Sequence, residues 1–527
     1  MNIPAGHTTI PTFGEAIGQH VRDRGTQVAL RYGERSTTYV ELDALTNRIA
    51  NALSARSRLG ERIAYLGKNS DLAVAITLGV AKAGMVLVPI IWRLAPQEIA
   101  YILADSEAAA LFVDEELAPL IPQLGALEMP VIQTEGVLAS SGWTSFADWI
   151  AAAACTPPAV DFAADQPVLQ IYTSGTTGRP KGAVLSHANA TRYRQIIEAS
   201  DLDWLKSDPG ETALLAMPYG HIAGAGQALL ILLAGGEMII HREFDPGAVL
   251  EAIEGHGLRR LFLVPAALKI LLDHPRAETT DFSSLRYFSY GASPIPVPLL
   301  EAGLKRLGCQ FIQVYGMTET WGSVVALAPQ DHDPQRRHLL AAAGKAMPGV
   351  DMRVRGQSGA ILPPGETGEI EIRSPSNLIG YWHQEQATRE ALSDDGWLRT
   401  GDAGMLDVDG YLYIQDRLKD MIITGAENVY PAEVESVIYG HPDVTDAAVI
   451  GVPDPKWGEA VKAVVVLRPG AVPNPEEIIA FARERLAGFK CPKSIDVIDV
   501  LPRNPSGKIL RRELREPYWA GYERRVN

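Results

Sequence analysis

Short apolar runs alternate with helix-like segments through the middle of the chain. The runs at residues 260–264, 286–293 and 309–316 are strand-like, and the segments between them, 266–274 and 298–308, have the spacing of amphipathic helices. Such alternation predicts βαβ units and a mostly parallel sheet. We therefore expect an α/β fold for the large N-terminal part of the chain.

The pattern changes after about residue 345. Segments 350–356, 368–374 and 410–415 alternate polar and apolar residues between glycine turns, which predicts a small antiparallel sheet or β-barrel. A second change follows the ionic stretch 416–420, where a tail begins that contains two strand-like runs and a helix starting at Asn474. We expect a boundary near residue 418, with a large domain over 1–418 and a small α+β domain over 419–527.

Composition narrows the class of protein. The 527 residues are 46% hydrophobic and carry a net charge of −15, which is typical of a folded enzyme and disfavours nucleic acid as a partner. Cys155, Cys309 and Cys491 lie far apart, so neither a disulfide framework nor a zinc site is predicted, and a reducing cytoplasm is expected. The apolar stretches 72–92 and 222–240 are interrupted by polar residues, so we expect core elements and no transmembrane segment.

The stretch YTSGTTGRPKG, residues 172–182, places small and hydroxylated residues directly after an apolar run. Such a turn can converge N–H and hydroxyl groups on one anion, as a phosphate cradle does, although Ser/Thr/Gly clusters are more often plain loops. A P-loop is excluded, because its lysine follows the second glycine directly. The candidate phosphate ligands are the hydroxyl groups of Thr173, Ser174, Thr176 and Thr177, the N–H groups of Gly175 to Gly178, and Lys181.

Four further motifs accompany this one: YGMTET at 315–320, GWLRTGDAG at 396–404, DRLKDMIITGAENVYPAEVE at 416–435 and PRNPSGKILRRELRE at 502–516. In this order, over nearly the whole chain, they resemble the adenylate-forming superfamily of acyl-CoA synthetases, peptide-synthetase adenylation domains and luciferases. The resemblance implies a mobile C-terminal lid domain, and ATP, Mg²⁺ and CoA as ligands. It also implies that the turn at 173–178 with Lys181 holds the β- and γ-phosphates.

The same resemblance gives roles to the other motifs. Thr318 corresponds to an α-phosphate contact and Glu319 to the magnesium ligand, a role that suits a carboxylate because Mg²⁺ prefers oxygen ligands. Lys508 corresponds to the lysine that enters between the substrate carboxylate and the α-phosphate and neutralises transition-state charge. Gly291, Ala292 and Ser293, with Tyr315, correspond to the adenine pocket, and Asp402 corresponds to the ribose ligand. Arg417 is a further nucleotide candidate, and Gly425 corresponds to the glycine at the pantetheine tunnel of CoA.

Two further candidates also have an ordinary structural explanation. His221, in MPYGHIAG, corresponds to a residue that gates the acyl pocket, but a lone histidine among apolar neighbours is also typical of an ordinary core position. Lys419, two residues after Arg417, corresponds to the hinge of the lid, and a salt-bridged linker is the alternative.

These motifs favour an AMP-forming acyl-CoA ligase that makes acyl-CoA, AMP and diphosphate through an acyl-adenylate. A stand-alone adenylation enzyme that loads a carrier protein is the alternative, and a degenerate nucleotide sensor is disfavoured because Glu319, Asp402 and Lys508 are all present. The carboxylic acid is expected to be a medium- or long-chain fatty acid, with an aryl or steroid-derived acid as the alternative. Small residues near the motifs leave room for such an acid, whereas Trp321 beside them would narrow the acid pocket. The small residues are Gly224, Gly226, Gly322 and Ser323. Peripheral membrane contact through RRELRE and a homodimer stay open.

Overall fold

The computed structural model describes residues 10–173, 179–425, 427–503 and 509–520. Its helices are α1 (Phe13–Arg24), α2 (Tyr39–Ser54), α3 (Asp71–Lys82), α4 (Pro96–Asp105), α5 (Phe146–Ile150), α6 (His187–Glu198), α7 (Ile222–Leu233), α8 (Pro246–Gly255), α9 (Pro265–Asp273), α10 (Val297–Leu307), α11 (Glu385–Ala391), α12 (Pro431–Tyr439), α13 (Pro475–Arg483) and α14 (Arg511–Trp519).

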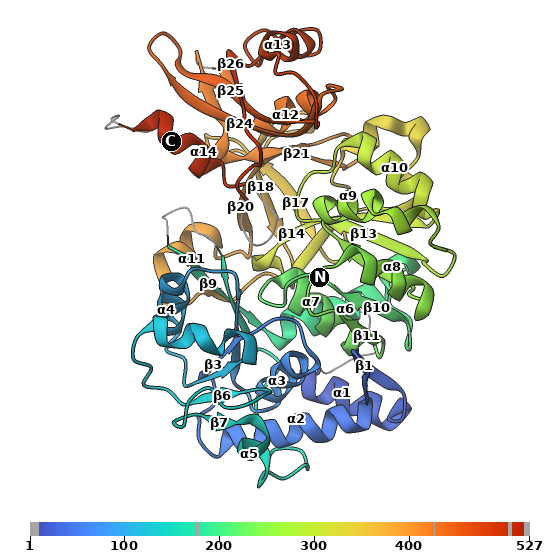
Figure 1. Cartoon of the computed structure of the whole chain (residues 1–527), viewed down its shortest axis with the longest axis vertical. Helices are drawn as coiled ribbons and strands as arrows, with labels where there is room; N and C mark the ends of the chain where they lie inside the picture. Colours follow the sequence, from blue (N-terminus) through green and yellow to red (C-terminus); the bar gives the residue numbers. More distant parts are fainter. Residues whose placement is uncertain (1–9, 174–178, 426, 504–508, 521–527) are drawn as a thin grey trace.

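Two large sheets form the lower part of the molecule in Figure 1. Sheet I consists of β3 (Arg62–Leu66), β4 (Val86–Ile90), β5 (Ala110–Val113), β6 (Val131–Gln133), β7 (Thr144–Ser145), β8 (Pro167–Thr173), β9 (Lys181–Ser186) and β19 (Gly380–Tyr381). Sheet II consists of β1 (Val28–Tyr32), β2 (Arg35–Thr38), β10 (Thr212–Leu215), β11 (Glu237–Ile240), β12 (Arg260–Leu263), β13 (Tyr287–Gly291), β14 (Gln310–Met317), β15 (Gly322–Leu327) and β16 (Lys345–Ala346).

Both sheets are mostly parallel, as the alternation of strand-like and helix-like segments predicts. The order in sheet I is β19-β9-β8-β4-β3-β5-β6-β7, and in sheet II it is β16-β15-β14-β13-β12-β10-β11-β1-β2. The predicted unit β12-α9-β13-α10-β14 is present, and its strands pair in parallel. The α/β fold is therefore confirmed.

A shared apolar core lies between the two sheets. Its buried residues come from strands of both sheets and from α1, α2, α3 and α7. Helix α3 is apolar on all sides and almost wholly buried, because it has a sheet on either side of it. The stretches 72–92 and 222–240 are thus core elements, and within the described parts of the chain no helix is long and apolar enough to cross a membrane.

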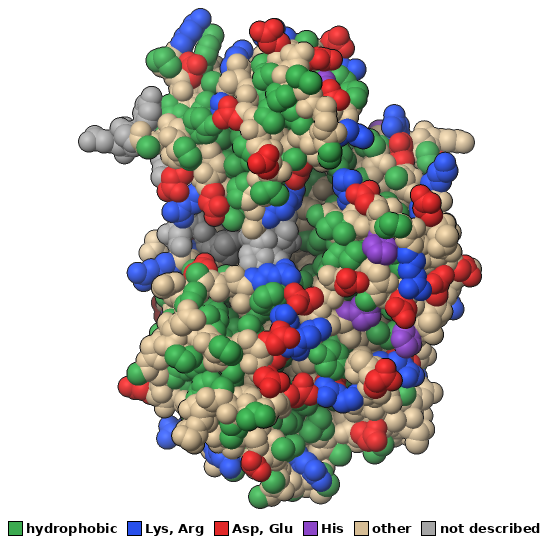
Figure 2. All heavy atoms as spheres, viewed as in Figure 1, with side chains coloured by type: hydrophobic (Ala, Val, Ile, Leu, Met, Phe, Trp, Pro, Cys, Tyr) green, Lys and Arg blue, Asp and Glu red, His purple; other side chains and the backbone are tan. Residues whose placement is uncertain are grey.

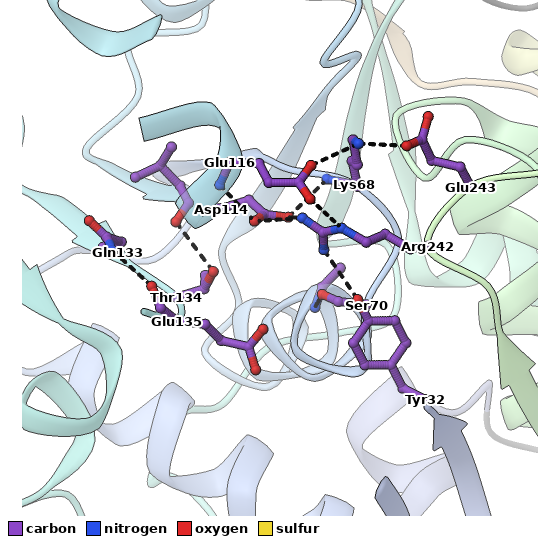
Figure 3. Close-up of polar contacts among 12 residues, drawn as sticks. Tyr32, Lys68, Ser70, Asp114, Glu116, Gln133, Thr134, Glu135, Arg242 and Glu243 are labelled. Carbon is purple, nitrogen blue, oxygen red and sulfur yellow. Dashed lines mark hydrogen bonds and ion pairs between the residues drawn. The ribbon is translucent and has the colours of Figure 1, made fainter. Parts of the chain in front are cut away.

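An ionic cluster joins loops of the two sheets and is shown in Figure 3. Arg242 follows β11 of sheet II and pairs with Asp114, which follows β5 of sheet I, at 2.9 Å. Lys68, after β3, pairs with Glu116 at 2.7 Å and with Glu243 at 2.5 Å. The cluster therefore ties the carboxyl ends of strands from both sheets to each other.

The region after residue 345 forms an open antiparallel sheet and not a barrel. This sheet III has the order β17 (Asp351–Arg355), β18 (Gly368–Arg373), β20 (Leu398–Leu406), β21 (Leu412–Arg417), and in the described residues β17 and β21 do not pair with each other. Four strands are too few to enclose a side-chain-filled barrel. Closure is also unnecessary, because Ile370 and Ile372 of β18 pack in one cluster with Val324 and Val325 of β15.

The C-terminal part has a sheet and core of its own, at the top of Figure 1. Sheet IV has the order β23 (Glu427–Val429), β22 (Ile422–Thr424), β25 (Gly458–Leu467), β24 (Val444–Asp454), with β26 (Ser494–Val497) parallel to β25. The helix predicted at Asn474 is α13, and the Asn474 side chain accepts the N–H of Glu477 at 3.3 Å. The boundary near residue 418 stays a prediction, although sheet IV begins just after it.

Candidate active site

The candidate residues gather where parallel strands of the two large sheets end. Thr173 is the last residue of β8, Gly291 is the last residue of β13, and Thr318 and Glu319 follow β14. His221 lies between β10 and the first residue of α7. Ligands of open α/β sheets bind at the carboxyl ends of the strands, so this edge is the expected place for a site.

Glu319 is the centre of the first group of side chains. It is 5% exposed and lies in the short 3₁₀ turn Thr318–Thr320. Its Oε1 accepts hydrogen bonds from the Thr173 hydroxyl at 3.3 Å and from the Tyr381 hydroxyl at 3.0 Å. The chain thus brings the start of the hydroxyl-rich turn and the predicted magnesium ligand together, although they are far apart in sequence.

Tyr381 is a site residue that the sequence analysis missed. It lies in β19, which pairs with β9 and so places its ring beside Lys181, whose Nζ is 5.2 Å from the ring centroid. Burial, and then the Glu319 carboxylate, raise the pKa of Tyr381, so its hydroxyl stays protonated and donates. A two-residue strand has no periodicity, and only the aromatic residue after Gly380 could have drawn attention to it.

Asp402 is the centre of a second group. Its Oδ2 accepts the Tyr315 hydroxyl at 2.7 Å, and its Oδ1 lies 3.0 Å from Nε of Arg417. Asp402 is 7% exposed and stands opposite Arg417 in the pairing of β20 with β21. Burial, and then the Asp402 carboxylate, raise the pKa of Tyr315 well above its ordinary value.

Arg417 connects the two groups electrostatically. Burial disfavours its charged form, but Asp402, Tyr315 and Glu319 outweigh burial and raise the pKa of Arg417. The predicted ribose aspartate is thus in direct contact with Arg417, and the predicted magnesium ligand acts on the same cation electrostatically. In Figure 2 the surface is hollowed between the C-terminal part and the rest of the molecule.

The segment predicted for adenine has the backbone of a tight turn. A side chain at Gly291 would place its Cβ 2.2 Å from the carbonyl oxygen of Val314, so glycine is required there. Ala292 has a φ of +67°, which is rare for a residue with a side chain and marks a strained position. Ala292 and Ser293 are exposed, next to the partly exposed Tyr315.

The other predicted residues are placed as follows. His221 is half-buried at the N-terminus of α7. Gly425 directly follows β22, is exposed, and has a φ of +59°. Ser174, Gly175, Thr176, Thr177, Gly178 and Lys508 lie outside the described residues.

The donor set around Glu319 fits a magnesium ion that also binds phosphate. Among the described residues, Glu319 has hydroxyl donors but no salt-bridge partner, and no group of three or more His, Cys, Asp and Glu side chains is present. A buried carboxylate with no cation in direct contact is costly. Mg²⁺ usually takes one or two carboxylates, and the nucleotide phosphates and water complete its shell.

Comparisons with known proteins agree with this arrangement. Residues 18–382 match the family model described as AMP-binding enzyme, and residues 433–508 match the AMP-binding enzyme C-terminal domain. The fold and the two groups of side chains thus define an adenylate-forming enzyme. The chain belongs to the AMP-binding enzyme family and is an AMP-forming acid–thiol ligase.

The relatives carry different substrate names. A fatty acid–[acyl-carrier-protein] ligase, ScoC, of Streptomyces coeruleorubidus is 42% identical over 99% of both chains. A feruloyl-CoA synthase of an Amycolatopsis species is 42% identical over 93% of this chain and 96% of its own. The crystal structure of ATP-bound MatB from Rhodopseudomonas palustris superposes with a TM-score of 0.85 at 32% identity, over 97% of this chain and all of its own.

Proposed function

We propose that the protein activates a carboxylic acid with ATP and transfers the acyl group to CoA. The acid oxygen attacks the α-phosphorus and diphosphate leaves, and then the CoA thiolate attacks the acyl carbonyl and AMP leaves. The observation that supports the proposal is a pair of side-chain groups, one centred on Glu319 with Thr173 and one on Asp402 with Tyr315 and Arg417. One group suits metal-bound phosphate and the other suits vicinal hydroxyls.

Each residue has a proposed part in this reaction. Thr173 and Lys181, with Mg²⁺ on Glu319, hold the leaving diphosphate, and Thr318 contacts the α-phosphate. Asp402 accepts from the ribose hydroxyls and keeps its position through Tyr315 and Arg417. Positioning and charge stabilisation dominate such a reaction, because several negative charges meet at one phosphorus.

The C-terminal part completes the site in this proposal. We propose that residues 419–527 form a lid that turns about Lys419, brings Lys508 to the substrate carboxylate for adenylation, and later presents Gly425 to the pantetheine arm of CoA. Sheet IV supports this division, since it has its own apolar clusters with α12, α13 and α14.

The half-reactions separate these roles experimentally. The variant Lys508→Ala should lose diphosphate release by about two to three orders of magnitude, the usual effect of removing a transition-state charge contact. It should still convert a supplied acyl-adenylate to the thioester. Lys305→Ala, on the exposed side of α10, is the matched control and should keep both rates. Equal loss of both half-reactions in Lys508→Ala would refute the assigned role.

A second candidate function rests on the carrier-protein ligase among the relatives. In that case the acyl group passes to a carrier-protein thiol instead of CoA. Thiol consumption with CoA alone, measured after diphosphate release is established, decides between the two. If adenylate forms and CoA is never consumed, the CoA ligase proposal is wrong. The medium- or long-chain fatty acid predicted from sequence stays a prediction, because the relatives include both a fatty acid ligase and an aryl acid synthase.

A further inference from the structure

Trp321 lies where the chain leaves the proposed reaction centre. It follows the Thr318–Thr320 turn and is 3% exposed. Its indole covers Gly226 of α7, since a Cβ built on Gly226 would lie 3.8 Å from Nε1 of Trp321. A helix rises 1.5 Å per residue, so Gly226 lies about 7.5 Å farther along α7 than His221. The indole therefore lies over the second turn of α7, away from the helix end at which His221 stands.

The backbone holds Trp321 in a strained conformation. Its φ is +55°, and it is the bulkiest of four non-glycine residues with positive φ in the described parts of the chain. The Thr320 hydroxyl enforces this turn by donating to the Gly322 carbonyl at 2.7 Å and accepting the Met317 N–H at 3.0 Å. A large side chain in the left-handed region is an outlier, and such strain gathers at functional sites.

The indole N–H of Trp321 has no acceptor among the described residues. Nε1 of Trp321 is buried and makes no hydrogen bond to any described residue. The ring instead meets the edge of Phe13, with 5.8 Å between centroids. Buried donors in folded proteins are nearly always paired, so an unpaired one at a substrate site points to a partner that arrives with the ligand.

The neighbouring glycines show how little space is left around this indole. A Cβ at Gly224 would come within 2.2 Å of the Pro218 carbonyl oxygen, and one at Gly226 within 2.9 Å of Ile222. Only Gly322 faces open space, with its nearest contact at 3.9 Å. Small residues along α7 therefore accommodate the indole and the backbone and do not form a channel for a long chain.

We propose that Trp321 closes the acid pocket and that its indole N–H donates a hydrogen bond to an oxygen at the end of the substrate remote from the carboxylate. This inference rests on the proposed function and specifies the class of carboxylic acid that the enzyme uses. The substrate is a compact acid, planar or short, that carries a distal hydroxyl, ether or carbonyl oxygen. An unbranched long-chain acid would leave the N–H unpaired and would meet the indole ring.

Two pairs of acids test the hydrogen bond in the full-length protein with ATP and CoA. They are 3-phenylpropenoic acid with its 4-hydroxy derivative, and hexanoic acid with 6-hydroxyhexanoic acid. The wild type should show a kcat/KM for diphosphate release about tenfold higher for the oxygenated member of at least one pair, since a net hydrogen bond contributes about 1 kcal/mol and an unmade one costs more. Trp321→Phe keeps the bulk, removes the donor and should bring that ratio close to one.

A second variant tests the closure of the pocket. Trp321→Ala should raise kcat/KM for straight-chain acids of ten or more carbons at least tenfold relative to hexanoic acid, because it removes the ring over Gly226. Trp149→Phe is the control, since Trp149 is also buried and packs against Phe112, far from this site. Trp149→Phe should change neither the ratio of kcat/KM between the members of each acid pair nor the ratio of kcat/KM between long acids and hexanoic acid.

The outcomes are distinct. If wild type and Trp321→Phe show the same ratio in both pairs, the hydrogen-bond proposal is overturned. If Trp321→Ala is folded by its circular dichroism and gains nothing on long acids, the closure is overturned; if it does not fold, Trp321→Phe decides alone. If the wild type releases diphosphate with no acid at all, the proposed function itself fails.

Discussion

Removing the Arg242 guanidinium should destabilise the junction between the two large sheets. The side chain of Arg242 is 29% exposed, and the side chain of its main partner, Asp114, is 8% exposed. It donates to Asp114 at 3.0 Å, to Glu116 at 3.2 Å and to the Tyr32 hydroxyl at 3.1 Å. Burial alone would lower the pKa of Arg242, but these partners outweigh it and raise that pKa. Among the described residues, Arg242 is the only salt-bridge partner of Asp114.

The expected loss of stability in Arg242→Met follows from how exposed each member of the ionic cluster is. Breaking a fully buried pair costs about 3–5 kcal/mol, and an exposed pair contributes about 0–1 kcal/mol. Asp114 is buried while Arg242 and Glu116 are partly exposed, so we expect Arg242→Met to cost about 2–3 kcal/mol. The entropy of unfolding is about 2.1 cal/mol/K per residue, so in a cooperative unit of about 400 residues this loss corresponds to a fall of about 2–4 °C in the apparent melting temperature.

Calorimetry of four proteins checks this reasoning: wild type, Arg242→Met, Asp114→Asn and the double variant. The double variant should be more stable than the sum of the single effects by about 1–2 kcal/mol, because it leaves no unpaired buried charge. Arg93→Met is the control; its pair with Glu243, at 3.2 Å, is exposed on both sides and should contribute below about 1 kcal/mol. Additive effects of Arg242→Met and Asp114→Asn would refute the argument.

Four further predictions concern the site and its support. Asp402→Asn should raise the KM for ATP about tenfold or more, because it weakens charged hydrogen bonds worth about 1.5–3 kcal/mol each. An unchanged KM would exclude the ribose role. Glu319→Gln should raise the Mg²⁺ concentration that gives half-maximal diphosphate release, and a parallel loss at all Mg²⁺ concentrations would contradict the metal role. Burial lowers the pKa of His187 to about 3, so near pH 6.5 the unfolded chain takes up a proton that the folded chain does not, and stability is lost as the pH falls from 6.5 towards 3. His187→Gln lacks this loss, so the difference in melting temperature between wild type and this variant should become smaller from pH 7 to pH 5. A constant difference would show that His187 does not contribute to the pH dependence. A Cβ at Gly425 would lie 2.7 Å from the Trp457 ring, so Gly425→Ala should slow thioester formation from supplied adenylate more than it slows adenylation. Gly410→Ala is the control, because a Cβ at Gly410 would meet nothing within 4 Å, and it should leave the ratio of these two rates unchanged.

Much of the fold was open to prediction because it depends on local pattern. The alternation from residue 260 to 316 predicts β12, α9, β13, α10 and β14, since each element is short and shows its own periodicity. The cap at Asn474 predicts the start of α13 to the residue. The barrel expected after residue 345 was wrong in its closure, because whether an antiparallel sheet closes depends on what covers its face, and here β15 of another sheet does.

The candidate site was predicted in part for the same reason. Thr173, Glu319, Asp402 and Arg417 stand in motifs that the sequence displays, and the structure places Thr173 against Glu319 and Arg417 against Asp402. Tyr381 was missed, because a residue in a two-residue strand becomes a neighbour of Glu319 only when β19 pairs with β9.

The chain by itself determined which residue types are present, where the helices and strands begin, and which motifs can meet ATP, because these depend on neighbours a few positions apart. Only the tertiary structure decided that Tyr381 donates to Glu319, that Arg417 pairs with Asp402, and that Trp321 covers Gly226 with no acceptor for its N–H among the described residues. The physical reason is distance along the chain. Contacts between residues tens or hundreds of positions apart follow from how sheets and helices pack as whole bodies, and no local pattern encodes them.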